Sequence, residues 1–314
     1  MAPSRADDLA GDVFADVLAE HVRRIQQRIP PALADEPDAV HRLRTAVRRL
    51  RTTLAVYRPV FERRASDDLR DRLAELGHVL GPARDLEVRR DDVESTGRAS
   101  RTPLAARERL VVELTEAHAA AHRDLLEWCA GERMRALNAE LVRWVAAPPW
   151  AEAAEKPARK VARKRLRKAV RRSLSAADDV DLGVLADRTE ELARDTRPTA
   201  DDLLDAAHRL RKAGRRLTHA ARDVTRKPTK VLGSHARELD IAGKAVQSSL
   251  GDHRDALLLA RRARVVADAV ETEGGDRRPY DRLAHAAERR AYAALDDAAR
   301  AVAALRDVAG RTGQ

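Results

Sequence analysis

Apolar residues recur along most of the chain at intervals of three and four positions, which is the pattern of amphipathic α-helices. The clearest example is the segment 39–58. At about 100° per residue, its apolar stripe consists of Val40, Leu43, Val47, Leu50 and Leu54. A second stripe, about 110° round the same helix, consists of His41, Arg44, Arg48 and Arg51. The segment therefore predicts a helix with one buried side and one cationic side.

The same arrangement occurs a second time in the segment 206–222. The residue types His, Arg, Leu, Arg, Ala, Arg, Arg and Leu keep one spacing from His41 to Leu50 and from His208 to Leu217. The cationic side of the second copy consists of His208, Arg211, Arg215 and Arg222. Neither 39–61 nor 206–222 contains an acid, although like charges three and four positions apart repel one another along a helix. We therefore predict that both faces bind an anion.

A third basic helix is predicted in the segment 156–175, where ten Lys and Arg residues occur without an acid between them. A block of like charge is often a disordered tail. Here one side of the helix is formed by Ala162, Leu166, Ala169, Val170 and Ser173. This side favours a docked helix over a tail, with a solvated basic surface as the alternative to phosphate contact. The segment aligns with the first predicted helix, so that Arg165, Arg167, Lys168 and Arg172 take the places of His21, Arg23, Arg24 and Arg28.

Further helices are expected at 7–29, from 66 to 77 or 80, from the break at 80–85 to about 93, and at 104–130, 133–145, 182–194, 198–224, 230–250, 254–270 and 281–308. Pro30-Pro31 is expected to end the first of them. The sequence Leu-Gly-x-x-Arg-Asp, at 80–85 and again at 250–255, is expected to separate two helices, with its Asp capping the second. The pattern breaks at 146–150, which is the best candidate for a boundary.

The order of these elements repeats on both sides of that boundary. The predicted fold class is therefore all-α, with two antiparallel helical bundles related by an internal pseudo-twofold and a basic groove between them. We expect one domain, 1–314, in which the halves 7–147 and 156–310 are joined by the linker 148–155.

Composition supports a folded helical protein with acidic partners. Apolar residues make up 44% and charged residues 36%, with 14 Gly and 13 Pro. The net charge of +10 and the pI near 10.3 favour nucleic acid, an anionic membrane or a phosphate polymer. Cys129 is the only cysteine, and no Cys/His spacing resembles a zinc site, so we expect no metal and no cofactor. Because no secretory signal or apolar span is recognisable, we expect a cytoplasmic protein.

The helix His-x-x-Arg-x-x-x-Arg-Arg-Leu occurs in two copies, each followed by Leu-Gly-x-x-Arg-Asp, and in this the chain resembles the CHAD domains, named for a histidine-bearing α-helical domain. The resemblance covers roughly 12–308. It implies a two-bundle helical fold whose basic groove binds inorganic polyphosphate, and association with polyphosphate granules in some members. The chain departs from the repeat where Gly214 replaces Val47 and Thr218 replaces Arg51, which argues against a fully symmetric site.

Many CHAD domains follow a triphosphate-tunnel (CYTH) domain. We expect the stand-alone type here, because there is no room for one before Asp12 and its alternating Glu-x-Glu-x-Lys strand is missing. The triphosphatase activity of the CYTH domain is therefore not expected of this chain. Two other features give little support to catalysis. Asp252-His253 is in the reverse order for a phosphohydrolase pair, and Gly274-Gly275 lacks the Lys-Ser/Thr of a nucleotide-binding loop.

The residues expected to bind polyphosphate are basic and His side chains of the predicted basic helices: Arg24, Arg28, His41, Arg44, Arg48, Arg49, Arg51, Lys164, Arg165, Arg167, Lys168, Arg171, Arg172, His208, Arg211, Lys212, Arg215, Arg216 and Arg222. For His41 and His208 the alternative is a hydrogen bond inside a bundle. The opposite flank of the two His helices carries Arg42, Arg49, Arg209 and Arg216. The sequence leaves open whether these four bind the anion or pair with acids of neighbouring helices.

The function that these observations favour is non-catalytic binding of inorganic polyphosphate, with targeting to polyphosphate granules as a further expectation. The alternatives are a nucleic-acid-binding helical protein and, less favoured, an enzyme of polyphosphate turnover. Nucleic acid is the weaker partner, because three Trp, three Tyr and two Phe offer few stacking platforms and no helix-turn-helix signature is evident. We expect no membrane partner, and the sequence does not identify a protein partner.

Overall fold

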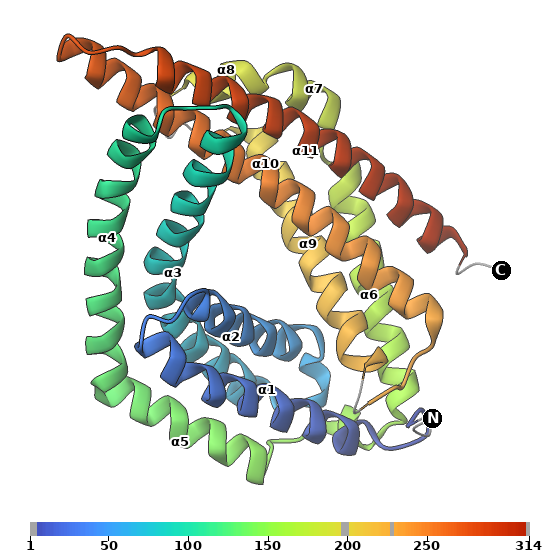
Figure 1. Ribbon diagram of the computed structural model, residues 1–314. Helices are drawn as coiled ribbons and strands as arrows, with labels where there is room; N and C mark the ends of the chain where they lie inside the picture. Colours follow the sequence, from blue (N-terminus) through green and yellow to red (C-terminus); the bar gives the residue numbers. More distant parts are fainter. Residues whose placement is uncertain (1–4, 196–200, 227–228, 312–314) are drawn as a thin grey trace. The chain divides into compact units, whose positions relative to one another are not determined.

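The computed structural model describes residues 5–195, 201–226 and 229–311, and all regular elements in these ranges are helices (Figure 1). The longer ones are α1 (Ala10–Leu33), α2 (Ala39–Val56), α3 (Arg63–Ala99), α4 (Leu104–Ala130), α5 (Glu132–Ala146), α6 (Ala158–Asp178), α9 (Asp202–Thr225), α10 (Ser234–Thr272) and α11 (Arg278–Gly310). Short helices are η1 (Arg58–Val60), η2 (Glu152–Glu155), α7 (Leu182–Asp187) and α8 (Thr189–Arg194). The predicted all-α fold class is confirmed. Among the described helices, none has the length and hydrophobicity to cross a bilayer.

The sequence predicted several helix bounds closely. The segments 104–130 and 133–145 correspond to α4 and α5, and the docked helix expected in 156–175 is α6. The single helix expected at 182–194 is instead two short helices, α7 and α8. The predicted start of the second His helix at 198 lies outside the described residues, and α9 begins at Asp202 within them.

The predicted helix ends at proline and glycine were wrong in three places. Pro30-Pro31 lies inside α1, and the two Leu-Gly-x-x-Arg-Asp sequences lie inside α3 and α10. Asp85 and Asp255 are therefore not helix caps. An internal proline costs about 3 kcal/mol through a lost hydrogen bond and a clash. Packing outweighs this cost in α3, because Leu76, Leu80 and Ala83 continue one fully buried stripe through the sequence.

The chain folds into two compact units, each made of three segments. Unit 1 comprises Met1–Arg84, Ala119–Arg172 and Arg216–Ile241. Unit 2 comprises Asp85–His118, Ser173–Arg215 and Ala242–Gln314. Each unit thus takes residues from before and after 148–155, and α3, α4, α6, α9 and α10 contribute to both. The halves 7–147 and 156–310 stay a prediction about the sequence repeat.

Unit 1 has an aromatic centre beside α1 and α2, which pack side by side (Figure 1). Phe14 and Tyr57 are fully buried with ring centroids 4.3 Å apart, and Trp150 stacks on Phe61 at 5.6 Å. The segment 148–155 is bound to this centre by backbone hydrogen bonds, including Ala151 N to Val60 O at 2.9 Å. The predicted linker is therefore a packed part of unit 1.

Candidate functional site

The cationic face of α2 lies beside a buried apolar stripe, as its periodicity predicts. Val40, Leu43 and Leu50 are fully buried, whereas His41, Arg44, Arg48 and Arg51 are half-buried. Burial, followed by the positive charge of Arg84, lowers the pKa of His41 to about 4. His41 is therefore neutral at pH 7, and its Nε2 lies 3.5 Å from the hydroxyl of Thr45. In the free protein it acts as a hydrogen-bonding group and adds no charge.

Cationic side chains from four helices come together in unit 1, and we call this set the cationic cluster. It consists of Arg51 of α2, Arg70 of α3, Arg165, Lys168 and Arg172 of α6, and Arg216 of α9. The pKa of Arg216 is lowered by burial and then by Arg172 and Arg70. That of Arg51 is lowered by burial and then by Arg70. The helices thus concentrate like charges that the sequence places as far apart as 51 and 216.

Few carboxylates neutralise the cationic cluster. Among the residues that the structure describes, only Arg70 of the six forms an ion pair, with Asp67 at 2.7 Å. Nε of Arg165 donates to the carbonyl of Val56 at 2.5 Å, which fixes this guanidinium at the end of α2. The pKa of Lys168 is lowered first by Arg172 and next by Arg165. Such unpaired, mutually repelling cations favour binding of an anion that several of them share.

A second group of arginines surrounds Arg49, also within unit 1. Its pKa is lowered by burial and then by Arg222, Arg24 and Arg28. Two of these neighbours have internal partners: Arg24 pairs with Glu20 at 2.5 Å, and Arg222 pairs with Asp240 at 2.8 Å. Nη1 of Arg28 donates to the carbonyl of Arg42 at 2.9 Å. The structure therefore brings these predicted residues together but occupies Arg24 and Arg222 with carboxylates.

A buried polar network holds this part of α9 against α1 and α2. Nε2 of His21 lies 3.3 Å from Oδ1 of Asp223, and the hydroxyl of Thr53 donates to Oδ2 of the same carboxylate. The Asp223 side chain is only 7% exposed. Burial raises its pKa, but His21 and Thr53 outweigh that effect and the net pKa is lowered. The prediction missed this network, although Asp223 is the first acid after the acid-free stretch 206–222.

The second His copy forms a separate group within unit 2. The pKa of His208 is lowered by burial, then by Lys212 and by Arg254 of α10, followed by Arg211 and Arg215. Arg254 was not among the predicted site residues. The guanidinium of Arg211 lies over Gly251, where a Cβ would be 3.2 Å from Nη2. In the first copy Arg44 lies beside Gly81, but the corresponding distance is 3.9 Å, an ordinary contact. Glycine thus leaves space for the motif arginine in the second copy, and the first copy does not require it.

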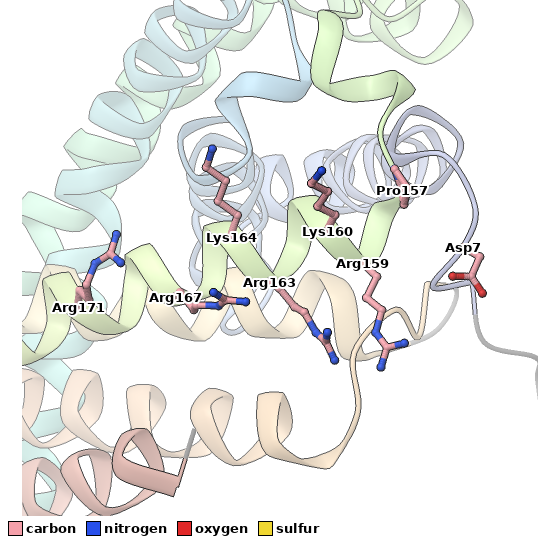
Figure 2. Close-up of a pocket in the computed structure, with 8 residues that line it drawn as sticks. All are labelled: Asp7, Pro157, Arg159, Lys160, Arg163, Lys164, Arg167 and Arg171. Carbon is pink, nitrogen blue, oxygen red and sulfur yellow. The ribbon is translucent and has the colours of Figure 1, made fainter. Parts of the chain in front are cut away.

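The basic residues of α6 divide between two faces. Arg165, Lys168 and Arg172 belong to the cationic cluster. The remaining ones line an open pocket of about 630 Å³ within unit 1 (Figure 2). Three of these were predicted site residues: Lys164, Arg167 and Arg171. Three others were missed, although they belong to the same charge run: Arg159, Lys160 and Arg163. A single groove for both His copies stays a prediction.

Comparisons with known proteins agree with this fold. The CHAD domain model matches residues 16–264 of the chain. The structure is similar to that of PptA from Streptomyces chartreusis, with a TM-score of 0.67 and 19% sequence identity over 96% of this chain and 99% of that chain. It is also similar to the crystal structure of the CHAD domain from the plant Ricinus communis, with a TM-score of 0.65 and 20% identity over 96% and 94% of the two chains. Among curated proteins, no match to the sequence was found.

Proposed function

Because the chain belongs to the CHAD domain family, we propose that it binds inorganic polyphosphate and does not hydrolyse it. The family is associated with polyphosphate, and the chain carries a net charge of +10 that suits such a partner. The ligand chemistry is charge-assisted hydrogen bonding from guanidinium and ammonium groups to non-bridging phosphate oxygens.

The observation that carries the proposal is the cationic cluster. Like charges from four helices are held together in unit 1, and five of the six form no ion pair in the described part of the chain, although Asp71 partly offsets the repulsion at Arg51. Their repulsion costs free energy in the free protein. A polyanion that lies across them removes this repulsion and gains a hydrogen bond at each guanidinium. We place the polyphosphate on the cationic cluster and extend the proposal to granule association in the cytoplasm.

The test measures affinity for long-chain polyphosphate at moderate salt with two charge-reversal variants. Arg172→Glu and Arg216→Glu change exposed side chains, so the fold should be retained. Each is expected to weaken binding at least about tenfold, which corresponds to one lost charge-assisted hydrogen bond. The matched control is Arg143→Glu on α5, an exposed arginine of the same unit with no ion pair among the described residues. Equal losses in all three variants would contradict the proposed site.

Two further measurements separate the alternatives. Incubation of the protein with polyphosphate and Mg²⁺ should release no orthophosphate. Release above that of a buffer control would show hydrolysis and would favour the enzyme alternative over non-catalytic binding. Duplex DNA measured in parallel at about 0.15 M salt should bind more weakly than polyphosphate. Equal affinity for both polymers would favour the nucleic-acid alternative.

A further inference from the structure

The outer face of α6 is a second basic surface, distinct from the cationic cluster. Its members are Arg159, Lys160, Arg163, Lys164, Arg167 and Arg171, which line the pocket of about 630 Å³ together with Pro157 and Asp7. Figure 2 shows the two lysines pointing to one side of α6 and Arg159 and Arg163 to the other. From Arg159 to Arg171 the helix rises about 18 Å, so the surface is elongated along its axis.

None of the six basic side chains of the outer face forms an ion pair in the part of the chain that the structure describes. Many other arginines do, for example Arg107 with Glu94 at 2.6 Å and Arg290 with Asp92 at 3.0 Å. One acid, Asp7, stands among the lining residues. Backbone hydrogen bonds hold its segment at the start of α6, including Ala158 N to Asp8 O at 2.8 Å. Ion pairs are thus common among the arginines of this chain, whereas the basic side chains of the outer face form none with the described residues.

The outer face and the cationic cluster adjoin around α6. At about 100° per residue, the six outer residues cover an arc of about 140°, and Lys168, Arg172 and Arg165 follow within the next 100° or so. Lys168 stands between the two sets. Cations from both lower its pKa: Arg172 and Arg165 of the cluster, and Arg171 and Lys164 of the outer face. The basic surface is therefore continuous round the helix.

We propose that a polyphosphate chain bound at the cationic cluster continues round α6 and occupies its outer face as a second binding segment. This inference rests on the proposed function, since it extends the same ligand. The six cations follow one another along about 18 Å of α6, and a bare phosphate chain is thin enough to lie in the open pocket beside them. Among the described residues that line it none is aromatic, so they offer no stacking platform for a single nucleic-acid strand.

The inference predicts that outer-face residues matter for long chains alone. The test variant combines Arg159→Gln, Lys160→Gln and Arg163→Gln, three exposed positions on the N-terminal half of the outer face of α6. The control variant combines Arg63→Gln, Arg64→Gln and Arg143→Gln, which removes the same charge from exposed positions of unit 1. Affinities for a short and a long polyphosphate are measured for both variants and the wild type, with circular dichroism as the check on folding.

For the wild type we expect long chains to bind more tightly than short ones. In the outer-face variant the ratio of long-chain to short-chain affinity should fall at least about tenfold, while the short-chain affinity stays unchanged. The control variant should keep the advantage. An unchanged ratio in the outer-face variant, an equal loss for short chains, or a larger loss for duplex DNA would each overturn the second segment. Failure of the wild type to bind either polyphosphate would instead overturn the proposed function, and this inference with it.

Discussion

Arg216 and Arg222 lie six positions apart on α9 and have different surroundings. Arg222 pairs with Asp240 at 2.8 Å, whereas Arg216 is exposed and repelled by Arg172 and Arg70. Helical periodicity assigned Arg222 to the predicted anion face and left open whether Arg216 binds the anion or pairs with an acid. It could not separate them, because the partner of Arg222 is 18 residues away and belongs to another helix. Residue type and helical periodicity locate a basic face, but only packing reveals which guanidinium is already occupied.

His219 provides a prediction about stability and pH. It is 5% exposed, and burial lowers its pKa to about 3, below the ordinary value of 6.5. The unfolded chain therefore binds a proton between these two pH values that the folded core does not, so stability falls on acidification. We expect the free energy of unfolding to drop from pH 7 to about pH 4.5, with His219 contributing about 2–3 kcal/mol. Urea unfolding at the two pH values measures this drop.

The comparison for His219 uses two glutamine variants. His219→Gln should reduce the pH dependence by about 2 kcal/mol, since the titrating group is gone. His78→Gln, at an exposed position of α3, is the matched control substitution. Because Asp223 has a lowered pKa, its own contribution is lost only below about pH 4, outside the tested interval. Identical pH profiles for wild type and His219→Gln would contradict the assignment.

Gly214 provides a second prediction at the residue scale. A Cβ at this position would lie 2.9 Å from the carbonyl oxygen of Gly243 and 3.3 Å from Cγ1 of Val246. The departure from Val47 of the first copy is thus explained by close approach of α9 and α10. Gly214→Ala should lower the free energy of unfolding by about 1–3 kcal/mol, despite a better helix propensity. Gly310→Ala, where nothing lies within 4 Å, should cause no loss in the same urea titration.

At the scale of elements, α3 and α10 show where local signals fail. The sequence Leu-Gly-x-x-Arg-Asp contains a helix-breaking glycine, and its first copy adds Pro82. Local propensity predicts a break, yet each sequence is the middle of a helix of 37 or 39 residues. Buried stripes on both sides of the glycine keep each helix continuous, and in the second copy the glycine makes room for Arg211 of the neighbouring His helix. Hydrophobic periodicity therefore predicted the extent of these two helices better than the helix-breaking glycine and proline residues did.

Pro82 allows a direct test of this explanation. Its ring removes the hydrogen bond to the carbonyl four residues earlier, which destabilises the helix locally, and packing outweighs this loss of stability. Pro82→Ala restores this bond at an exposed position and should raise the free energy of unfolding by up to about 3 kcal/mol. Pro279→Ala is the control, because a proline in the first turn of α11 has no such bond to lose. An unstable Pro82→Ala variant would show that the neighbours require the proline.

At the scale of the whole molecule, the excess of ten positive charges attracts any polyanion. Such attraction depends on salt, because cations that neutralise phosphates release condensed counterions. If about six cations contact the polymer, affinity should fall about 10³-fold between about 0.05 and 0.2 M salt. Arg172→Gln combined with Arg216→Gln should reduce the slope of log affinity against log salt by about two. Measuring the slope for both proteins tests how many cluster residues reach phosphate.

Net charge acts on every phosphate polymer, so it does not account for a preference between two of them at one salt concentration. A preference must come from the arrangement of the cations and the width of the surface that carries them. We therefore expect polyphosphate to exceed duplex DNA in affinity at about 0.15 M salt, and this excess to shrink in the doubly substituted protein. Competition titrations of labelled polyphosphate with unlabelled DNA measure the excess. If the substituted protein loses affinity for both polymers by one common factor, the cationic cluster supplies charge alone and the discrimination lies elsewhere in the chain.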